Sequence, residues 1–322
     1  MSHRGSLGRL LRRHPASPKV AAEMIRRRTR IHFAQVTDDL IPDAFEIYEG
    51  DCFKTAIKKH PRVKGFIKDF WRWNEYALSL MNQNSFPYIS MQQLLAKMIA
   101  PFTGEVLADI GCGAGDFCAR LLQQDGHWIR KIFAVDIDAW GSLARVPQTL
   151  KDAGYRGKVA LAQDSTMSRL PIWDETVDCV VSSLGGVTYA GWWFEDGELV
   201  CEGREALRRS LKDIRRILKP GGYLGFSGLM PNPDFMMIFK YSLWEPLRHC
   251  RLKPLWMTLK HGLRIKKISA FMHECECKQT AHYLTLEEWA AYLKEAGFEV
   301  VDASVGESYA KQGIVVVARK VS

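Results

Sequence analysis

The sequence predicts an α/β protein built on a doubly wound sheet, with a helical cap at its N-terminus and an insertion before its last helix. Three observations favour this fold class. Short apolar runs typical of buried strands alternate with helical patterns from residue 105 onward. One of these runs, residues 106–110, leads into a glycine-rich turn that opens a helix, as in nucleotide-binding α/β units. The chain is 47% hydrophobic, which is enough for a packed core.

The glycine-rich turn directly follows the first expected strand. Its glycines are Gly111, Gly113 and Gly115, and Asp109 and Asp116 flank them, so an acid fills the third glycine position of the dinucleotide pattern G-x-G-x-x-G. Two carboxylates would repel a pyrophosphate, which disfavours an NAD-binding domain. They suit a ligand that is cationic at this end. S-adenosylmethionine (SAM) is such a ligand, because it carries an ammonium and a sulfonium and has no phosphate.

The next two strands carry polar residues at their carboxyl ends. The second strand, residues 131–135, ends in Asp136, which lies 21 residues after the last glycine of the turn. A strand-end acid at about this spacing binds ribose hydroxyls. The third strand, residues 158–163, ends in Asp164 and Ser165.

The later elements continue the alternation of strands and helices. We expect a fourth strand at 177–183, a helix at 205–218, a fifth strand at 224–227, a last helix that begins after Thr285, and two final strands at 298–303 and 313–318.

In this order the motifs resemble those of class I SAM-dependent methyltransferases. The resemblance implies a Rossmann-like doubly wound sheet of seven strands with the last antiparallel, methyl transfer as the activity, SAM as the cofactor and S-adenosylhomocysteine as the product. Aminopropyl transfer of the spermidine-synthase kind shares the fold, but no dense acidic polyamine site follows the fourth strand. The matching motifs are Asp109–Gly115, Asp136, Asp164 with Ser165, 178–184 and 218–222, and residues 285–319 fit the family's last helix and two strands.

At matching positions the resemblance implies roles for individual residues. Asp109 is implied to anchor the amino group of the cofactor, Asp136 the ribose hydroxyls and Asp164 the adenine amino group. The other implied cofactor contacts line the same cleft, with Tyr88 at the methionine end: Tyr88, Gly111, Gly113, Gly115, Ile137, Ser165, Ser182 and Leu184.

We expect the chain to divide into two regions. Residues 1–102 form a basic arm and a helical cap without strands, with helices at 17–34, 42–60, 63–81 and 89–100. Residues 103–322 form the SAM-binding domain, which carries a substrate insertion at 229–284. Apolar residues interleaved with Lys and Arg in that insertion are typical of a lipid-facing helix and also of a cap helix packed on a domain.

The acceptor is expected to be a small or amphipathic organic molecule, with oxygen as the favoured target atom. Residues 185–198 are rich in glycine and aromatic residues and predict a mobile aromatic lid at the carboxyl end of the sheet. The N/D-P-P-Y/F motif of base-methylating relatives is absent there. If the acceptor needs a general base, the first candidates are His249, Tyr189 and His273, with His282 and Glu195 as further ones.

The net charge of +9 is concentrated in two patches. Residues 1–30 carry nine Lys or Arg against one Glu, and residues 244–267 carry seven against one. Such patches suit peripheral contact with an anionic membrane, or are only solvated surface. A nucleic-acid methyltransferase guided by the arm, and a non-catalytic SAM-binding assembly protein, are the alternative functions; nucleic acid is the less favoured partner.

Location and metal content follow from composition. The eight cysteines are scattered, which is typical of buried thiols in a reducing compartment, and we expect a cytoplasmic, membrane-peripheral protein. An organelle transit peptide at residues 1–22 is the less favoured alternative. Ligand spacing in His273-Glu-Cys-Glu-Cys277 fits no common zinc site, so no metal is expected. The oligomeric state does not follow from the sequence.

Overall fold

The computed structural model describes residues 46–49, 85–125, 127–137, 142–196, 198–249, 255–256, 259 and 270–321. The basic arm, the transit-peptide segment and the helices expected at 17–34 and 63–81 lie outside the described residues.

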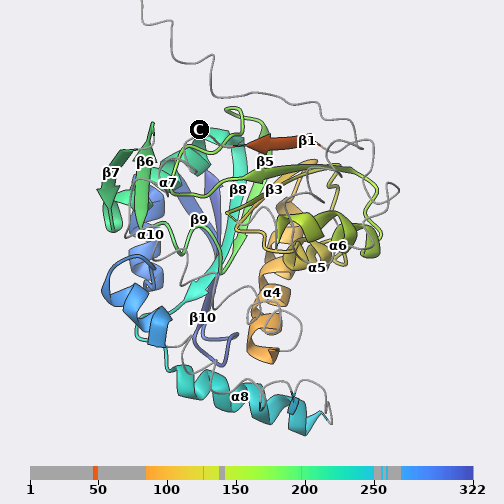
Figure 1. Cartoon of the computed structure of the whole chain (residues 1–322), viewed down its shortest axis with the longest axis vertical. Coiled ribbons are helices and arrows are strands. Elements are labelled where there is room, and N and C mark those ends of the chain that lie inside the picture. Colours follow the sequence, from red (N-terminus) through yellow and green to blue (C-terminus); the bar gives the residue numbers. More distant parts are fainter. Residues whose placement is uncertain are drawn as a thin grey trace, which may run out of the picture.

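The centre of the fold is an eight-stranded sheet in the order β1-β4-β3-β2-β5-β8-β10-β9 (Figure 1). All seven predicted strands are present, and β10 runs antiparallel to both of its neighbours while the other pairs are parallel. The predicted fold class is confirmed. The strands are β1 (Glu46–Glu49), β2 (Val106–Ile110), β3 (Lys131–Asp136), β4 (Lys158–Gln163), β5 (Val177–Ser183), β8 (Leu218–Leu229), β9 (Phe298–Val305) and β10 (Gly313–Lys320).

The eighth strand, β1, corrects the prediction of a helix at 42–60. Residues Glu46–Glu49 pair in parallel with Ala160–Gln163 at the sheet edge. The prediction of a strand-free cap is therefore also wrong. A stretch of four residues is too short to show a period of two, and its pairing with a distant strand outweighs the local helical pattern.

Helices cover both faces of the sheet (Figure 1). One face carries α4 (Phe86–Ile99), α5 (Asp116–Leu121) and α6 (Val146–Asp152), and the other carries α7 (Arg204–Ile217) and α10 (Leu286–Glu295). Successive side chains of β2 alternate between the two cores: Leu107 packs with the first set of helices and Ala108 with the second. Coverage on both faces explains why the central strands are almost continuously apolar.

The residues of the expected lid form a packed hairpin. Strands β6 (Trp192–Glu195) and β7 (Glu198–Glu202) pair antiparallel, and Trp192, Trp193 and Phe194 are all buried. The backbone N–H of Phe194 donates to Met167 O at 2.7 Å. The prediction of a mobile aromatic lid is therefore wrong, because these aromatic side chains bury their apolar surface in the domain.

The insertion before the last helix is helical where it is described. It contains α8 (Phe235–Arg248), which packs on α4, and a further helix at 270–277. Asp234 caps α8 by accepting from the N–H groups of Met236 and Met237. Among the described helices, none is both long enough and apolar enough to cross a bilayer.

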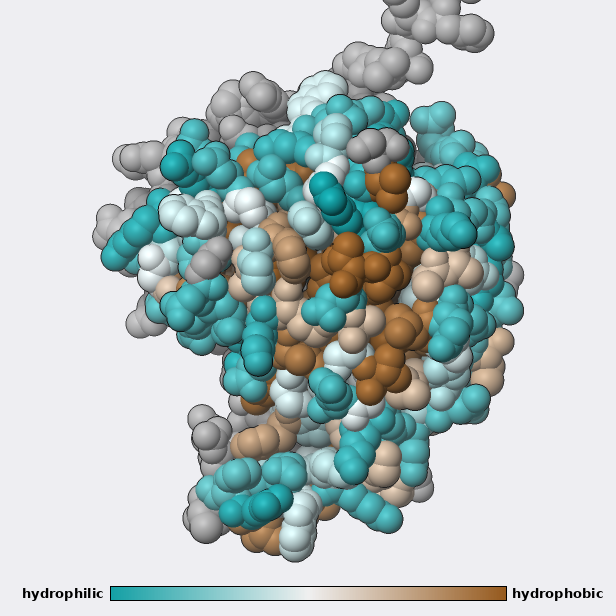
Figure 2. Space-filling view, turned by 180° about the vertical axis from the view of Figure 1, so that it is seen from behind, coloured by the Kyte–Doolittle hydropathy of each residue, from teal (hydrophilic) through white to brown (hydrophobic). Residues whose placement is uncertain are grey.

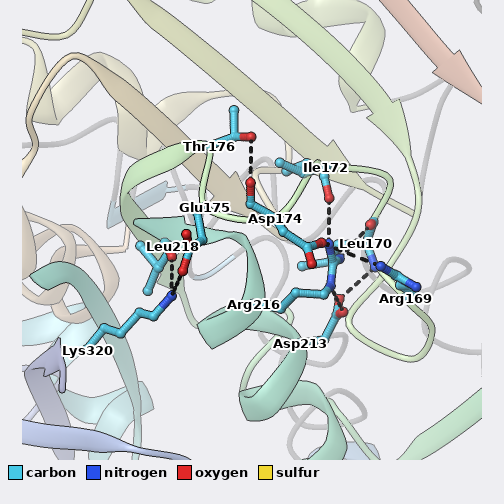
Figure 3. A network of polar contacts seen from close by, with 10 residues as sticks. All are labelled: Arg169, Leu170, Ile172, Asp174, Glu175, Thr176, Asp213, Arg216, Leu218 and Lys320. Carbon is cyan, nitrogen blue, oxygen red and sulfur yellow. Dashed lines mark hydrogen bonds and ion pairs between the residues drawn. The ribbon is translucent and has the colours of Figure 1, made fainter. Parts of the chain in front are cut away.

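A polar network fixes the loop between β4 and β5 to α7 (Figure 3). Arg216 donates to Asp213 Oδ1 and Asp174 Oδ1, each at 2.6 Å, and to the carbonyl oxygens of Leu170 and Ile172. Asp213 Oδ2 in turn accepts from Leu170 N at 2.7 Å. The Arg216 hydrogen bond lowers the pKa of Asp174 below its usual value. The network lies at the amino end of β5. The glycine turn follows the carboxyl end of β2, which is parallel to β5, so the network and the turn lie at opposite edges of the sheet.

Candidate functional site

The glycine turn between β2 and α5 is left-handed at all three glycines. Gly111, Gly113 and Gly115 have φ values of 75°, 54° and 83°. A Cβ on Gly111 would lie 2.6 Å from Gly186 N, so this position must be glycine for the loop after β5 to approach. A Cβ on Gly113 would meet nothing within 4 Å. The turn therefore presents open backbone on one side, as a ligand cradle requires.

Asp109 lies in β2, two residues before the turn, and is 1% exposed. Its Oδ2 accepts from Cys118 Sγ at 3.1 Å, whereas Oδ1 is buried without a hydrogen-bond partner among the described residues. Burial raises the pKa of this carboxyl to about 7. An orphaned carboxylate oxygen next to an open glycine cradle fits a cationic ligand group such as an ammonium.

Asp136 ends β3 and holds the glycine turn in place. Its Oδ2 accepts from Gly113 N at 2.8 Å, and the N–H groups of Gly111 and Cys112 donate to Val135 O. The carboxyl ends of β2 and β3 therefore meet at the glycine turn. Ile137 follows directly, where β3 leaves the sheet.

Asp164 shapes the turn after β4. Its Oδ1 accepts from Ser165 N at 2.7 Å and from Ser168 Oγ at 2.8 Å, and burial raises its pKa to about 7. Ser165 Oγ accepts from Met167 N. The implied adenine contact of Asp164 stays a prediction, and the hydrogen bonds show a structural role for the same side chain.

Ser182 ties β5 to β2 beneath the turn. Its Oγ donates to Ile110 O at 2.9 Å and accepts from Val187 N at 3.3 Å, and the residue is 1% exposed. Leu184, with a left-handed φ of 49°, starts the loop that reaches Gly111. The Ser182 hydroxyl is therefore engaged within the protein, and its expected contact with the cofactor stays a prediction.

Tyr88 lies close to the acids of the turn, and Tyr189 lies close to Tyr88. Tyr88 is in the first turn of α4, and burial raises its pKa, with Tyr309, Asp116, Asp109 and Tyr189 adding to the shift. Burial also raises the pKa of Tyr189. Tyr189 is thus protonated at neutral pH, and its expected catalytic role stays a prediction.

The two histidine candidates lie on the surface. His249 ends α8, is 54% exposed at its side chain and stacks on Phe86, while its Nε2 lies 3.4 Å from Glu245 Oε2. His273 is 62% exposed at its side chain and contacts Glu276. Nothing in these contacts joins either histidine to the glycine turn, and a general-base role for them stays a prediction.

His282 is the buried histidine among the described residues of the insertion. Its Nε2 lies 2.9 Å from Ala190 O and its Nδ1 lies 3.1 Å from Arg204 Nη1. Burial lowers its pKa to about 4, so the ring is neutral and accepts from Arg204 through Nδ1. No group of three potential metal ligands occurs among the described residues.

Three polar residues near this site were not found from the sequence. Ser308 has a buried hydroxyl without a partner within the described part of the chain, Tyr283 forms a hydrogen bond with Tyr189, and Tyr309 packs edge-on against Tyr88 with ring centroids 6.4 Å apart. They come from segments far from the glycine turn in the sequence. No spacing or motif in the sequence indicates that they meet it.

Comparison with known proteins identifies the domain. The family described as a methyltransferase domain matches residues 108–226, from β2 into β8. This chain carries a methyltransferase domain. The matched segment includes the glycine turn, Asp136, Asp164 and Ser182, so the match supports the predicted methyltransferase domain with SAM as its cofactor. The orphaned oxygen of Asp109 and the open side of Gly113 fit that cofactor.

The methyltransferase domain is also similar to individual proteins. The biotin biosynthesis bifunctional protein BioHC of Teredinibacter turnerae is 29% identical over 149 residues, which are 45% of this chain, and the chain spans 23% of that relative's length. A SAM-dependent methyltransferase of Methanosarcina mazei is 18% identical with a TM-score of 0.43, covering 68% of this chain and 93% of the other. An O-methyltransferase family 2 protein of Planctomyces limnophilus, in complex with apigenin, is 18% identical with a TM-score of 0.48, covering 78% and 61%.

Proposed function

We propose that this protein is a SAM-dependent methyltransferase that transfers a methyl group to an oxygen of a small or amphipathic organic acceptor. The observation that carries the proposal is the buried, orphaned Oδ1 of Asp109 beside the open glycine turn. Leaving a carboxylate oxygen unpaired in the interior is costly, and a cationic ligand group relieves that cost. The match of residues 108–226 to a methyltransferase domain supports the same ligand.

When bound, SAM supplies a methyl group on a cationic sulfur, and the residues of this chain position it. The glycine turn admits the cofactor close to the backbone, and Asp109 orients its amino group. Asp136 holds the turn through Gly113 N and lies where ribose hydroxyls are bound in α/β folds. Alignment of the acceptor with the methyl group can contribute several kcal/mol to catalysis.

Among the described residues, the arrangement of titratable groups favours an acceptor that needs no protein base. Tyr189 is protonated at neutral pH, and His249 and His273 are exposed. An acceptor oxygen that ionises by itself, such as a carboxylate, is consistent with these features.

The proposal is tested first by calorimetry with S-adenosylhomocysteine. We expect the full chain to bind it, and Asp136→Ala to weaken binding by roughly tenfold or more, about 1.4 kcal/mol. Asp152→Asn is the matched control, because Asp152 is exposed at the end of α6. Incubation with methyl-labelled SAM and a fractionated extract, followed by mass spectrometry, then identifies the acceptor. Undiminished affinity in Asp136→Ala would show that its assigned role is wrong.

We further propose that α8 rests on an anionic lipid surface that delivers an amphipathic acceptor. Met236, Trp244 and Leu247 are 57%, 60% and 53% exposed, and the exposed cations Lys240 and Arg248 lie among them. Spacings of four, four and three residues put positions 236, 240, 244 and 247 on one helix face. Figure 2 shows hydrophobic and hydrophilic side chains mixed on the lobe at the bottom, where Figure 1 places α8.

Sedimentation with vesicles that contain phosphatidylglycerol tests this contact. Trp244→Ser is expected to reduce the bound fraction severalfold, because a Trp at the interface buries a large apolar surface. Trp128→Ser is the matched control, since Trp128 is 75% exposed and precedes β3, outside α8. Equal binding of the two variants, or binding that is the same on neutral vesicles, would remove α8 from the proposal.

A further inference from the structure

The loop between β9 and β10, residues 306–312, contacts both the N-terminus of α8 and the first turn of α4. Strand β9 runs parallel to β8, β5 and β2, so this loop lies at the same edge of the sheet as the glycine turn. Its residues Ser308, Tyr309, Ala310 and Gln312 are at most 8% exposed. The loop is therefore packed into the domain at the edge that carries the proposed cofactor site.

Gln312 fastens this loop to the residue that caps α8. Its Nε2 donates to Asp234 O at 2.9 Å, and its Oε1 accepts from Asp234 N. The backbone oxygen of Gln312 also accepts from Met230 N at 2.9 Å. A buried amide that uses both its donor and its acceptor on one backbone residue fixes the position of the loop relative to the helix end.

Tyr309 joins the same loop to α4 and to the glycine turn. Its ring packs edge-on against Tyr88, and its backbone oxygen accepts from Gln312 N at 3.2 Å. Burial is the main cause of the raised pKa of Tyr88, and Tyr309, Asp116 and Asp109 add to the shift, so Tyr88 lies next to the acids of the turn. Successive contacts therefore run from α8 through Gln312 and Tyr309 to the proposed cofactor site.

The backbone of this loop is strained. Tyr309, Ala310 and Lys311 have left-handed φ values of 50°, 57° and 65° in succession, a conformation in which the Cβ of a residue crowds a carbonyl oxygen. Such strain persists only where surrounding contacts enforce it. Here those contacts are the hydrogen bonds of Gln312 at one end and the packing of Tyr309 at the other. Loss of either contact would let the loop relax, so its conformation depends on both ends.

We propose that Gln312 is a positioning residue, which holds the 306–312 loop against Tyr88 and thereby couples α8 to the occupancy of the cofactor site. The inference rests on the proposed function, because the ligand of that site is the cofactor. A ligand that restrains Tyr88 also restrains the loop, and Gln312 transmits the restraint to Asp234 at the start of α8. By linkage, a surface or molecule that restrains α8 would raise cofactor affinity by the same factor.

Hydrogen–deuterium exchange of the full chain, with and without saturating S-adenosylhomocysteine, tests this coupling. The reporter is a peptide that covers residues 235–241, which include the Met236 and Met237 amides capped by Asp234. In the wild type we expect the ligand to slow exchange there by roughly fivefold or more, the lower end of the usual coupling between two sites. Gln312→Leu should remove most of that difference.

Two further sets of variants assign the effect to the loop. Gln124→Leu is the matched control and should keep the full effect, since Gln124 donates to Arg120 O at 3.4 Å beyond the end of α5, outside both the loop and α8. Tyr309→Leu removes the edge-on packing and should reduce the slowing at α8, whereas Tyr309→Phe keeps the ring and should preserve it. A merely structural role of Gln312 would speed exchange in both conditions and leave the ratio of the two rates unchanged.

The outcomes separate this inference from the proposed function. An equal ratio in Gln312→Leu and the wild type, or no slowing at α8 in a wild type that binds S-adenosylhomocysteine, overturns the inference; the first result would assign the coupling to the direct packing of α8 on α4. Failure of the wild type to bind the ligand in calorimetry overturns the proposed function. If thermal unfolding shows that Gln312→Leu does not fold, the Tyr309 variants decide: equal ratios in Tyr309→Leu and the wild type overturn the inference.

Discussion

Proton release on cofactor binding is the sharpest consequence of the buried Asp109. In the free protein, burial raises the pKa of this carboxyl from 3.8 to about 7. A shift of this size makes the ionised form unfavourable by about 4 kcal/mol relative to water. A bound ammonium favours the carboxylate, so the carboxyl must lose its proton when the cofactor binds below pH 7.

The magnitude follows from the two pKa values. At pH 6 a group with a pKa near 7 is about nine-tenths protonated, so binding of S-adenosylhomocysteine should release about 0.9 proton. Affinity should increase by up to about tenfold per pH unit below 7 and level off above it. Calorimetry in two buffers of different ionisation enthalpy measures the released protons directly.

Two variants assign the effect to its residue. Asp109→Asn should abolish the proton release and flatten the pH dependence, because the amide does not titrate. Asp164→Asn should leave most of the release intact, although burial also raises the pKa of Asp164 to about 7. Binding at pH 6 without proton release, or a release that survives in Asp109→Asn, would refute the reasoning.

Three further predictions concern the turn and the fold. Gly113→Ala should weaken S-adenosylhomocysteine binding at least tenfold, while Gly154→Ala should leave it unchanged. Both glycines have a left-handed φ and open space around a Cβ, so both substitutions carry the same backbone strain of about 1–2 kcal/mol. Equal affinities of the two variants would show that Gly113 does not face the cofactor. Arg216→Met should lower the free energy of unfolding in urea by about 3 kcal/mol, because it leaves the buried Asp213 without its cation. The control Arg130→Met removes an exposed ion pair and should lower the free energy of unfolding by less than about 1 kcal/mol. His282 should make the fold sensitive to acid, because its pKa is lower in the folded state than its usual 6.5 and the unfolded state therefore binds the proton first. The free energy of unfolding should decrease by about 3 kcal/mol between pH 6.5 and 4. His282→Gln should remove this contribution in pH-dependent urea titrations. A loss of stability confined to pH above 7 would contradict that assignment.

The local patterns of the sequence determined the sheet and the polar ends of its strands. Apolar runs of the right length predict β2, β3, β4 and β5, because strands covered on both faces must be apolar along their length. The glycines before α5 and the acids Asp109 and Asp136 also lie where the motif predicts, since a sharp left-handed turn leaves few choices of residue. These features depend on neighbours in the chain, and a sequence records them directly.

Features that depend on contacts between distant segments were decided only by the tertiary structure. Strand β1 exists because Glu46–Glu49 finds the free edge of β4, and the aromatic residues of β6 are buried because the hairpin packs on the domain. Four tyrosines, Tyr88, Tyr189, Tyr283 and Tyr309, come from segments separated by up to 221 positions and lie close enough to influence one another electrostatically. Their burial and their shifted pKa values arise from that meeting, because each depends on which groups exclude water from a side chain rather than on its neighbours in the sequence.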